Sequence, residues 1–339
     1  MAQILKYLNP ALKTFDNWSA ERWDRFNSII LRRPRSINPF YMNCKKQEHY
    51  IHVSLTPEQQ RLYYQVAEEK MKPIKTKWGG ESAYPITEIF EMLTRLKQIC
   101  NHPSHYEQAV KKAVNVDYNN DDILEQVFLD EGEESANFEN ESINAQNIKD
   151  FVGKSNKMIK MMEILNERRN RGEKTIIFTQ YKMMGAIIEK VLEQQGFSPL
   201  FLNGSLEEGK REKILQDFKI DPHNQRLVLI TTVKVGGVGL NLFEANNVIH
   251  YDQWWNPAVL DQASDRVYRM GQEKNEVNIY ILYTENTIEK RIYDILQEKR
   301  KIANDFLDPI EAKYATPRKF DSIHDLELAI GIKKKNDVS

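Results

Sequence analysis

The chain has 339 residues, of which 41% are apolar and 29% are charged. This is the composition of a globular protein longer than one average domain. No stretch approaches the ~18 consecutive apolar residues of a membrane helix, and the N-terminus lacks the basic-then-apolar pattern of a signal peptide. The two cysteines, Cys44 and Cys100, exclude a disulfide framework and a four-cysteine zinc site.

The net charge of −1 hides an uneven distribution. Residues 117–150 contain eleven acids and one base, Lys149, so this segment carries −10 and leaves +9 for the rest of the chain. A basic body permits nucleic-acid binding without establishing it. The acids, asparagines and scarce aromatics predict a flexible acidic insertion over residues 111–155.

The first half predicts a strand followed by helices. "EHYIHVSL" (48–55) alternates like a strand, and we assign residues 37–55 to it and its connection. A helix begins with Thr56 as N-cap, Pro57 at the first helical position and Gln59 at the third. A second helical pattern, 86–100, ends where Asn101–His102–Pro103 would halt it. Residues 56–110 are therefore expected to be mainly helical.

The second half alternates strands with helices. Apolar, β-branched runs predict strands at 175–179, 199–202, 227–232, 248–251 and 277–282. Helical patterns lie at about 156–170, 182–195, 207–218, 257–270 and 287–305. Strands joined by single helices predict βαβ units and a parallel sheet over residues 156–286. Local signals agree, because Ser205 and Glu208 form a capping box and Asn256–Pro257 starts the next helix.

The stretch "DQASDRVYRMGQ" (261–272) carries two arginines one turn apart. Helical spacing aligns Gln262, Asp265, Arg266 and Arg269 on one stripe. The neighbouring apolar stripe consists of Leu260, Ala263, Val267 and Met270, which would dock the helix on a core. One reading is a solvated face with an Asp265–Arg269 pair, and the other is a guanidinium clamp for a polyphosphate.

A glycine-rich loop lies upstream of these arginines. The strand ending at Thr232 runs into "VKVGGVGLNL" (233–242), where small residues would let backbone N–H groups approach a phosphate or ribose. The loop does not match G-x-G-x-x-G, which counts against a dinucleotide-binding enzyme. "YDQWWNP" (251–257) separates it from the arginines.

In this order the motifs resemble the C-terminal motor lobe of Swi/Snf-type DNA translocases of helicase superfamily two. "TIIFTQY" (175–181), "TTVKVGGVGLNL" (231–242) and "QASDRVYRMGQ" (262–272) are similar to motifs IV, V and VI of that family. Upstream, "LNPALKTFDNW", "IILRRPR", "VSLTPEQQRLYY" and "LTRLKQICNHP" resemble the end of the first lobe, the interlobe linker and the protrusion. The similarity covers roughly residues 5–305, and "WWNP" is typical of the bacterial or archaeal branch.

The resemblance implies a RecA-like (P-loop NTPase-type) α/β lobe without its own P-loop, working on ATP and Mg²⁺ bound mainly by a first lobe. It implies Arg269 as the principal arginine finger and Arg266 as its companion. The other implied ATP-site residues are Gln262, Asp265, Gly237, Gly239 and Asn241. The implied contacts to double-stranded DNA, through phosphates and without sequence specificity, are Thr179, Gln180, Tyr181, Thr232, Lys234 and Trp254. Arg32 and Arg33 would couple the lobes, with surface salt bridges as the alternative.

Several of these residues keep a structural alternative. Trp254 and Trp255 could bury in the core instead of meeting a phosphate, and Lys234 could be solvated. "CNHPSH" (100–105) offers Cys100, His102 and His105 but no fourth ligand, so we expect a structural role and no metal cluster.

The first half of an ATPase site is missing from the sequence. The near match Gly153–Lys154–Ser155 has Ile148 where a P-loop needs glycine, so we interpret Ser155 as a helix cap. "FLDEGEE" (128–134) resembles a magnesium-binding box but lies in the acidic insertion. We therefore expect the chain alone to lack ATPase activity.

The expected organisation has seven parts. They are the end of the first lobe with the linker (1–36), the linker strand (37–55), the protrusion (56–110), the insertion (111–155), the RecA-like second motor lobe (156–286), a brace helix (287–310) and a tail (311–339), in which we expect "IKKKNDVS" (332–339) to be solvated. The alternative function is a non-catalytic RecA-like module that binds a protein partner or nucleic acid. Without a membrane segment, we expect a cytoplasmic, nucleoid-associated protein in a bacterium or archaeon and a nuclear one in a eukaryote.

Overall fold

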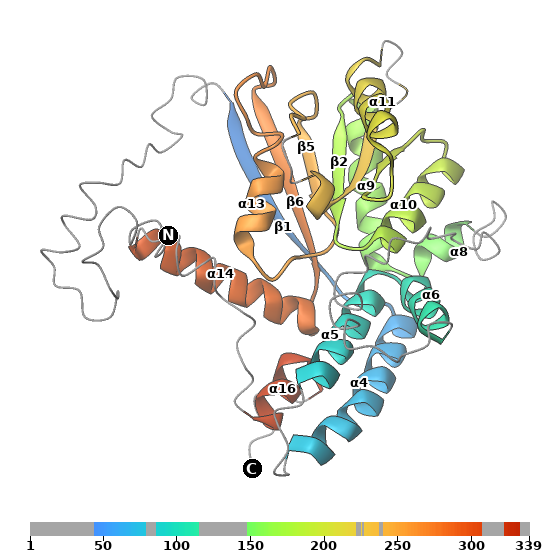
Figure 1. Ribbon diagram of the computed structural model, residues 1–339, viewed down its shortest axis with the longest axis vertical. Helices are drawn as coiled ribbons and strands as arrows, with labels where there is room; N and C mark the ends of the chain where they lie inside the picture. Colours follow the sequence, from blue (N-terminus) through green and yellow to red (C-terminus); the bar gives the residue numbers. More distant parts are fainter. Residues whose placement is uncertain are drawn as a thin grey trace, which may run out of the picture.

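A six-stranded parallel sheet organises the part of the chain that the structure describes (Figure 1). The computed structural model describes residues 44–78, 86–114, 148–221, 225, 227–236, 240–306 and 322–332. The strand order is β1-β6-β5-β2-β4-β3, and every neighbouring pair is parallel. The predicted parallel α/β fold is therefore confirmed.

The elements follow the predicted alternation. The strands are β1 (Lys45–Val53), β2 (Thr175–Thr179), β3 (Leu200–Leu202), β4 (Val228–Thr232), β5 (Asn247–His250) and β6 (Glu276–Thr284). The helices before the sheet's central part are α4 (Pro57–Trp78), α5 (Ile86–Asn101), α6 (Pro103–Val114) and α8 (Ile148–Gly153). The later helices are α9 (Asn156–Asn170), α10 (Lys182–Gln194), α11 (Glu208–Lys219), α12 (Val233–Gly236), α13 (Pro257–Ser264), α14 (Ile288–Phe306) and α16 (Ile323–Ala329).

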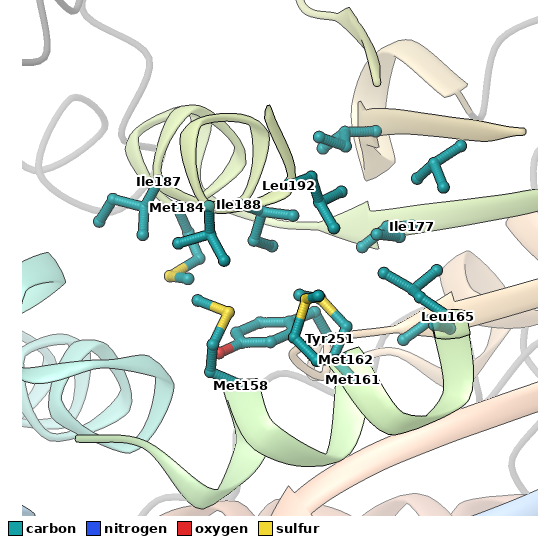
Figure 2. Close-up of a cluster of buried hydrophobic side chains, with 14 of the residues drawn as sticks. Met158, Met161, Met162, Leu165, Ile177, Met184, Ile187, Ile188, Leu192 and Tyr251 are labelled. Carbon is teal, nitrogen blue, oxygen red and sulfur yellow. The ribbon is translucent and has the colours of Figure 1, made fainter. Parts of the chain in front are cut away.

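One face of the sheet is covered by α9 and α10. Alternate strand residues such as Ile177 and Ile249 point to this face, because side chains on a strand alternate with period two. They meet a methionine-rich layer on α9 that includes Met158 and Met161, opposite Ile188 of α10 (Figure 2). Burial on this side is continuous, as expected for a parallel sheet.

The other face is covered by α11 and α13. Ile176 and Phe178 of β2, offset by one residue from the first set, pack here with Phe218 of α11 and Ala263 of α13. Because both faces are covered, β2 and β4 are buried along their whole length. The continuous apolar runs in the sequence therefore mark these central strands.

A third cluster joins the helical protrusion to the C-terminal helices. Residues of α4 and α5 pack against Ile288 and Ile292 of α14, and Leu326 of α16 is fully buried in the same cluster. Tyr63 of α4 donates its hydroxyl hydrogen to the carbonyl of Ile330 at 3.0 Å. Part of the predicted tail (311–339) thus folds as α16, because its apolar side chains, such as Leu326 and Ile330, complete this cluster.

The predicted helix starts are mostly confirmed. The Thr56 hydroxyl accepts from the Gln59 amide at 3.2 Å, and the Gln59 side chain accepts from the Thr56 amide at 3.2 Å, which is a complete capping box. Ser155 caps α9 by accepting from Met158 N. Asn256 caps α13 through a 3.0 Å bond from the amide of the second helical residue.

Two local predictions are wrong. The Ser205–Glu208 capping box does not form, because Glu207 is the N-cap of α11 and Ser205 instead accepts a hydrogen bond from Lys182. The insertion was expected to span 111–155, yet α6 continues to Val114 and α8 forms after it with Phe151 buried.

Some predictions lie outside the described residues. These are the first-lobe and linker segments with Arg32 and Arg33, residues 115–147 of the insertion including 128–134, and Gly237 and Gly239. The same holds for the side chain of Lys234. Among the described helices, none is long and apolar enough to cross a membrane.

Candidate functional site

The two arginines lie in a loop rather than on a helix. The helix expected over 257–270 ends at Ser264, and residues 265–272, named here the arginine loop, form turns. The carbonyl of Arg266 accepts a 3.0 Å bond from the Leu242 amide, so it is not free for the helical partner four residues on. Met270, expected inward, is 54% exposed as a result.

The arginine loop is held by bonds to other parts of the lobe. The side-chain amide of Gln272 donates to the carbonyls of Ala245 at 2.8 Å and Val267 at 3.2 Å. The hydroxyl of Tyr268 donates to the carbonyl of Cys44, immediately before β1, at 3.3 Å. These bonds hold the arginine loop to Ala245, between β4 and β5, and to Cys44, immediately before β1.

Arg269 stands exposed at the tip of this loop. Its guanidinium donates to the side-chain oxygen of Asn241 at 2.6 Å. Gly271 follows with φ of +102°, a conformation that favours glycine, and turns the chain toward β6. The structure therefore brings together the predicted residues Arg269 and Asn241, which come from two separate motifs.

The other predicted nucleotide-site residues lie around the loop. Gln262 is exposed on α13, whereas Asp265 and Arg266 are half-buried. The Asp265 backbone N–H closes the last turn of α13 by donating to the Asp261 carbonyl at 2.8 Å. The predicted helical stripe aligned Gln262 with Asp265, Arg266 and Arg269. In the structure the helix that would align them ends with α13.

Three of the residues predicted to contact DNA are buried at the carboxyl edge of the sheet. Thr179 is fully buried, and its hydroxyl donates to Asp252 at 2.5 Å. Tyr181 is 5% exposed and Thr232 9%. These three side chains are thus largely closed to solvent in this conformation, and their contact with DNA stays a prediction.

Gln180 and Trp254 are half-buried at the same edge. The Gln180 side chain donates to the Gln253 carbonyl and accepts from Lys97 at 3.0 Å. Trp254 and Trp255 both pack against the cluster of the protrusion and the C-terminal helices. The alternative that Trp254 and Trp255 bury in the core therefore holds for part of each side chain.

A buried polar network under this edge escaped the sequence analysis. Lys157 and Glu289 are both fully buried, and their charged groups meet at 2.6 and 2.7 Å. Asn101 accepts from Lys157 at 3.1 Å and donates to Asp252 at 3.2 Å. The Glu289 carboxylate also accepts two bonds from Thr284. The network thereby joins α5, α9, α14 and the ends of β5 and β6.

Lys97 of α5 is a second buried base in the same region. Its amine donates to the Gln253 carbonyl at 3.0 Å and lies 5.7 and 5.9 Å from the ring centres of Tyr181 and Trp255. Burial lowers the pKa of Lys97 to about 8, although Asp252 opposes that shift. The protrusion is thus joined to the sheet edge by polar contacts that exclude water.

A signal for Lys157 is present in the sequence. Lys157 shares its helical stripe with Met161, Ile164 and Leu165, all of which are buried. A lysine on an apolar stripe needs a buried partner, because an isolated ammonium is costly to bury. Its partner Glu289 lies far along the chain, and no local pattern identifies it.

The "CNHPSH" residues have structural positions. His102 forms a 2.9 Å bond to the Phe151 carbonyl, and its other ring nitrogen accepts from the Ser104 amide. His105 packs edge-on against Tyr181. Burial lowers the pKa values of His102 and His105 to about 4 and 3. Among the described residues, no group of three or more acidic, histidine or cysteine side chains could hold a metal ion.

Basic and hydroxyl groups collect beside the start of α10, where no prediction was made. Lys182 donates to Ser205, and Arg211 donates to the Gly204 carbonyl at 2.5 Å. The segment from Gly204 to Lys210 also has the glycine and lysine spacing of a P-loop, but Arg211 replaces the required Ser or Thr. It joins β3 to α11 without a left-handed glycine, so it does not form a P-loop cradle.

The fold and the arginine loop define a class, the RecA-like lobe of a two-lobe nucleotide-driven motor. Comparison with known families agrees. The helicase conserved C-terminal domain matches residues 155–271, and the SNF2-related domain matches residues 8–105.

Curated relatives extend the similarity along most of the chain. A protein described as a putative ATP-dependent helicase/translocase, YwqA of Bacillus subtilis, is 34% identical over 82% of this chain and 26% of its own length. The human DNA excision repair protein ERCC-6 is 29% identical over 89% of this chain and 18% of its own length. The chain thus spans about a quarter or less of the length of these relatives.

Solved structures give the same answer. The Sulfolobus solfataricus SWI2/SNF2 ATPase C-terminal domain has a TM-score of 0.56 and 28% identity, covering 86% of this chain and 100% of that one. The ATPase core from the same organism in complex with double-stranded DNA has a TM-score of 0.58 and 30% identity, covering 94% and 57%. The chain belongs to the SWI2/SNF2 family, as the motifs predicted.

Proposed function

We propose that the chain is the second motor lobe of an ATP-dependent translocase acting on double-stranded DNA. ATP and Mg²⁺ would bind mainly to a first lobe, and the arginine loop of this lobe would complete the pocket when the two lobes close. ATP would supply the phosphoryl group, and this chain would supply fixed positive charge. Hydrolysis would drive movement along the duplex without separating its strands.

The exposed position of Arg269 carries this proposal. Its exposed guanidinium has five donor hydrogens in all, one of which bonds to Asn241 at 2.6 Å. A planar, permanently charged group suits the oxygens of a γ-phosphate on which negative charge develops. Arg266, three residues earlier and half-buried, is the companion in this proposal.

Substitution of Arg269 tests the proposal in the two-lobe enzyme. Arg269→Ala should lower DNA-stimulated ATP turnover by about 10³-fold or more, the loss typical of a missing arginine finger. Arg269→Lys should remain well below the parent, because lysine lacks the fork geometry. The matched control is Arg171→Ala, which removes an exposed arginine paired with Glu167 at 2.7 Å and should leave turnover unchanged.

Two results would contradict the proposal. One is an Arg269→Ala enzyme with parental turnover, which would favour the non-catalytic interaction module. The other is strong DNA-stimulated hydrolysis by the isolated chain, which would place a complete ATP site within it.

We infer that DNA phosphates meet the lobe beside the start of α10. Lys182, Ser205 and Arg211 place two cations and a hydroxyl next to one another on the solvent side of the lobe. Gln180, a predicted contact that is half-buried, lies two residues before Lys182. This assignment replaces the buried Thr179 and Tyr181 as phosphate contacts.

The salt dependence of DNA binding tests this assignment. Lys182→Ala should weaken binding to any duplex sequence and reduce the slope of log K against log salt by about one. Lys160→Ala, which removes an exposed lysine paired with Glu163 on α9, is the control. An unchanged slope for Lys182→Ala would show that the phosphates lie elsewhere.

A further inference from the structure

We propose that Arg300 of α14 is a positioning residue for the arginine loop. It ties α14 to α13, the helix that leads directly into the loop, so that the placement of α14 sets the placement of Arg266 and Arg269. The effect of Arg300 on catalysis rests on the proposed function. The connection that Arg300 makes between α14 and α13 follows from contacts within the chain.

Arg300 joins three elements at one point. Its guanidinium donates to the Asp261 carboxylate on α13 at 2.5 Å and to the hydroxyl of Tyr50 on β1. Glu48 of β1 lies 3.7 Å away and accepts from Tyr50 at 2.7 Å. A guanidinium can serve carboxylate and hydroxyl partners at once because its donors are spread over a rigid fork. The Arg300 side chain is 22% exposed, so water screens this junction only in part.

The path from Asp261 to the arginine loop is short. Asp261 lies in the last turn of α13, and its carbonyl accepts the Asp265 amide at 2.8 Å, where the loop begins. Ser264 is held from the sheet side by His250, whose ring nitrogen lies 2.8 Å from the serine hydroxyl. Asp261 is therefore the point at which a group outside the sheet holds the end of α13.

The position of α14 depends on its own contacts with the sheet. Tyr293 of α14 stacks on Tyr283 of β6 at 4.5 Å and meets Tyr50 of β1 edge-on at 5.5 Å. In Figure 1 the helix then runs outward from the body of the molecule. Arg300 lies in this part of α14. A partner or neighbouring lobe that binds α14 would therefore shift the contacts of Arg300 with α13 and β1. Tyr268 of the loop also bonds to Cys44, immediately before β1, so two of the contacts that support the loop involve this strand or the residue before it.

Amide hydrogen exchange of the chain itself tests the link. Arg300→Gln and Asp261→Asn should each speed exchange in residues 265–272 by about three- to tenfold, because the end of α13 loses one support. The double variant should exceed neither single variant, since both remove the same bond. Arg300→Lys should restore part of the protection. The control is Lys290→Gln, which removes a pair internal to α14, Lys290–Asp294 at 2.5 Å, and should leave the arginine loop unchanged.

Two outcomes would overturn the proposal. One is unchanged exchange in the arginine loop of Arg300→Gln. The other is an equal rise in β2, β4 and α10, which would mean general destabilisation. In the two-lobe enzyme, Arg300→Gln should lower kcat with the KM for ATP within about twofold, and an unchanged kcat would also refute the positioning role. If Arg269→Ala left turnover intact, the proposed function would fail while the exchange result would still stand.

Discussion

Replacing Lys157 by methionine should sharply destabilise the lobe. Lys157 is fully buried, and its amine makes two bonds to Glu289, which is also fully buried. The substitution keeps a long apolar side chain but leaves the carboxylate with only its two bonds from Thr284. Loss of two charge-assisted bonds and of the balancing charge should cost about 3–5 kcal/mol of unfolding free energy.

Chemical denaturation with urea, followed by circular dichroism, measures this change. A cost of this size is a large share of a typical domain stability of about 5–15 kcal/mol, so the midpoint should fall markedly. Lys160→Met on the same helix, at an exposed pair with Glu163, should change stability by less than about 0.5 kcal/mol.

The double substitution Lys157→Met with Glu289→Gln separates charge from packing. It should recover part of the loss, because the uncompensated charge is removed along with its partner. A Lys157→Met cost below about 1 kcal/mol, or a double variant as unstable as the two single effects added together, would refute this account of the pair.

Two further predictions concern pH and packing. Burial lowers the pKa values of His102, His105 and His250 to about 4, 3 and 3, so the unfolded chain takes up more protons than the folded one below about pH 6.5. The free energy of unfolding should therefore fall by about 5 kcal/mol between pH 6.5 and pH 5 if all three histidines contribute, and a flat urea midpoint over this range would contradict it. Gly185→Ala should cost about 1–3 kcal/mol, because the new methyl group would lie 2.5 Å from the Phe201 ring; thermal unfolding at pH 7 measures this, and an unchanged midpoint would show that the ring moves freely.

The sequence predicts the sheet well because the relevant signals are local. β2 (TIIFT) and β4 (VLITT) each carry three successive apolar residues and are buried along their whole length, as expected for strands covered on both faces. The caps at Thr56 and Asn256 depend on residues two or three positions apart. Such short-range patterns give both the type and the order of the elements.

The candidate site was harder to predict because long-range contacts override its local pattern. Helical periodicity continues through Arg269, but α13 ends at Ser264, and the Arg266 carbonyl accepts a bond from Leu242 in the loop that follows. The burial of Thr179 depends on Asp252 and on the protrusion that covers it. The docking of α16 depends on Tyr63, more than half the chain away. None of these contacts has a signature within a few residues of its partners.

The pairing of β1 with β6 has a consequence for synthesis on the ribosome. Lys45 pairs with Glu276, so the first described strand leaves the ribosome long before the strand on which it aligns. At about 5–20 residues per second, the wait is on the order of ten seconds or more. Throughout that time an extended segment with open hydrogen-bonding groups is exposed to other nascent chains. We therefore expect chains stalled before residue 276 to be far more prone to aggregate, or to recruit chaperones, than chains released after residue 284.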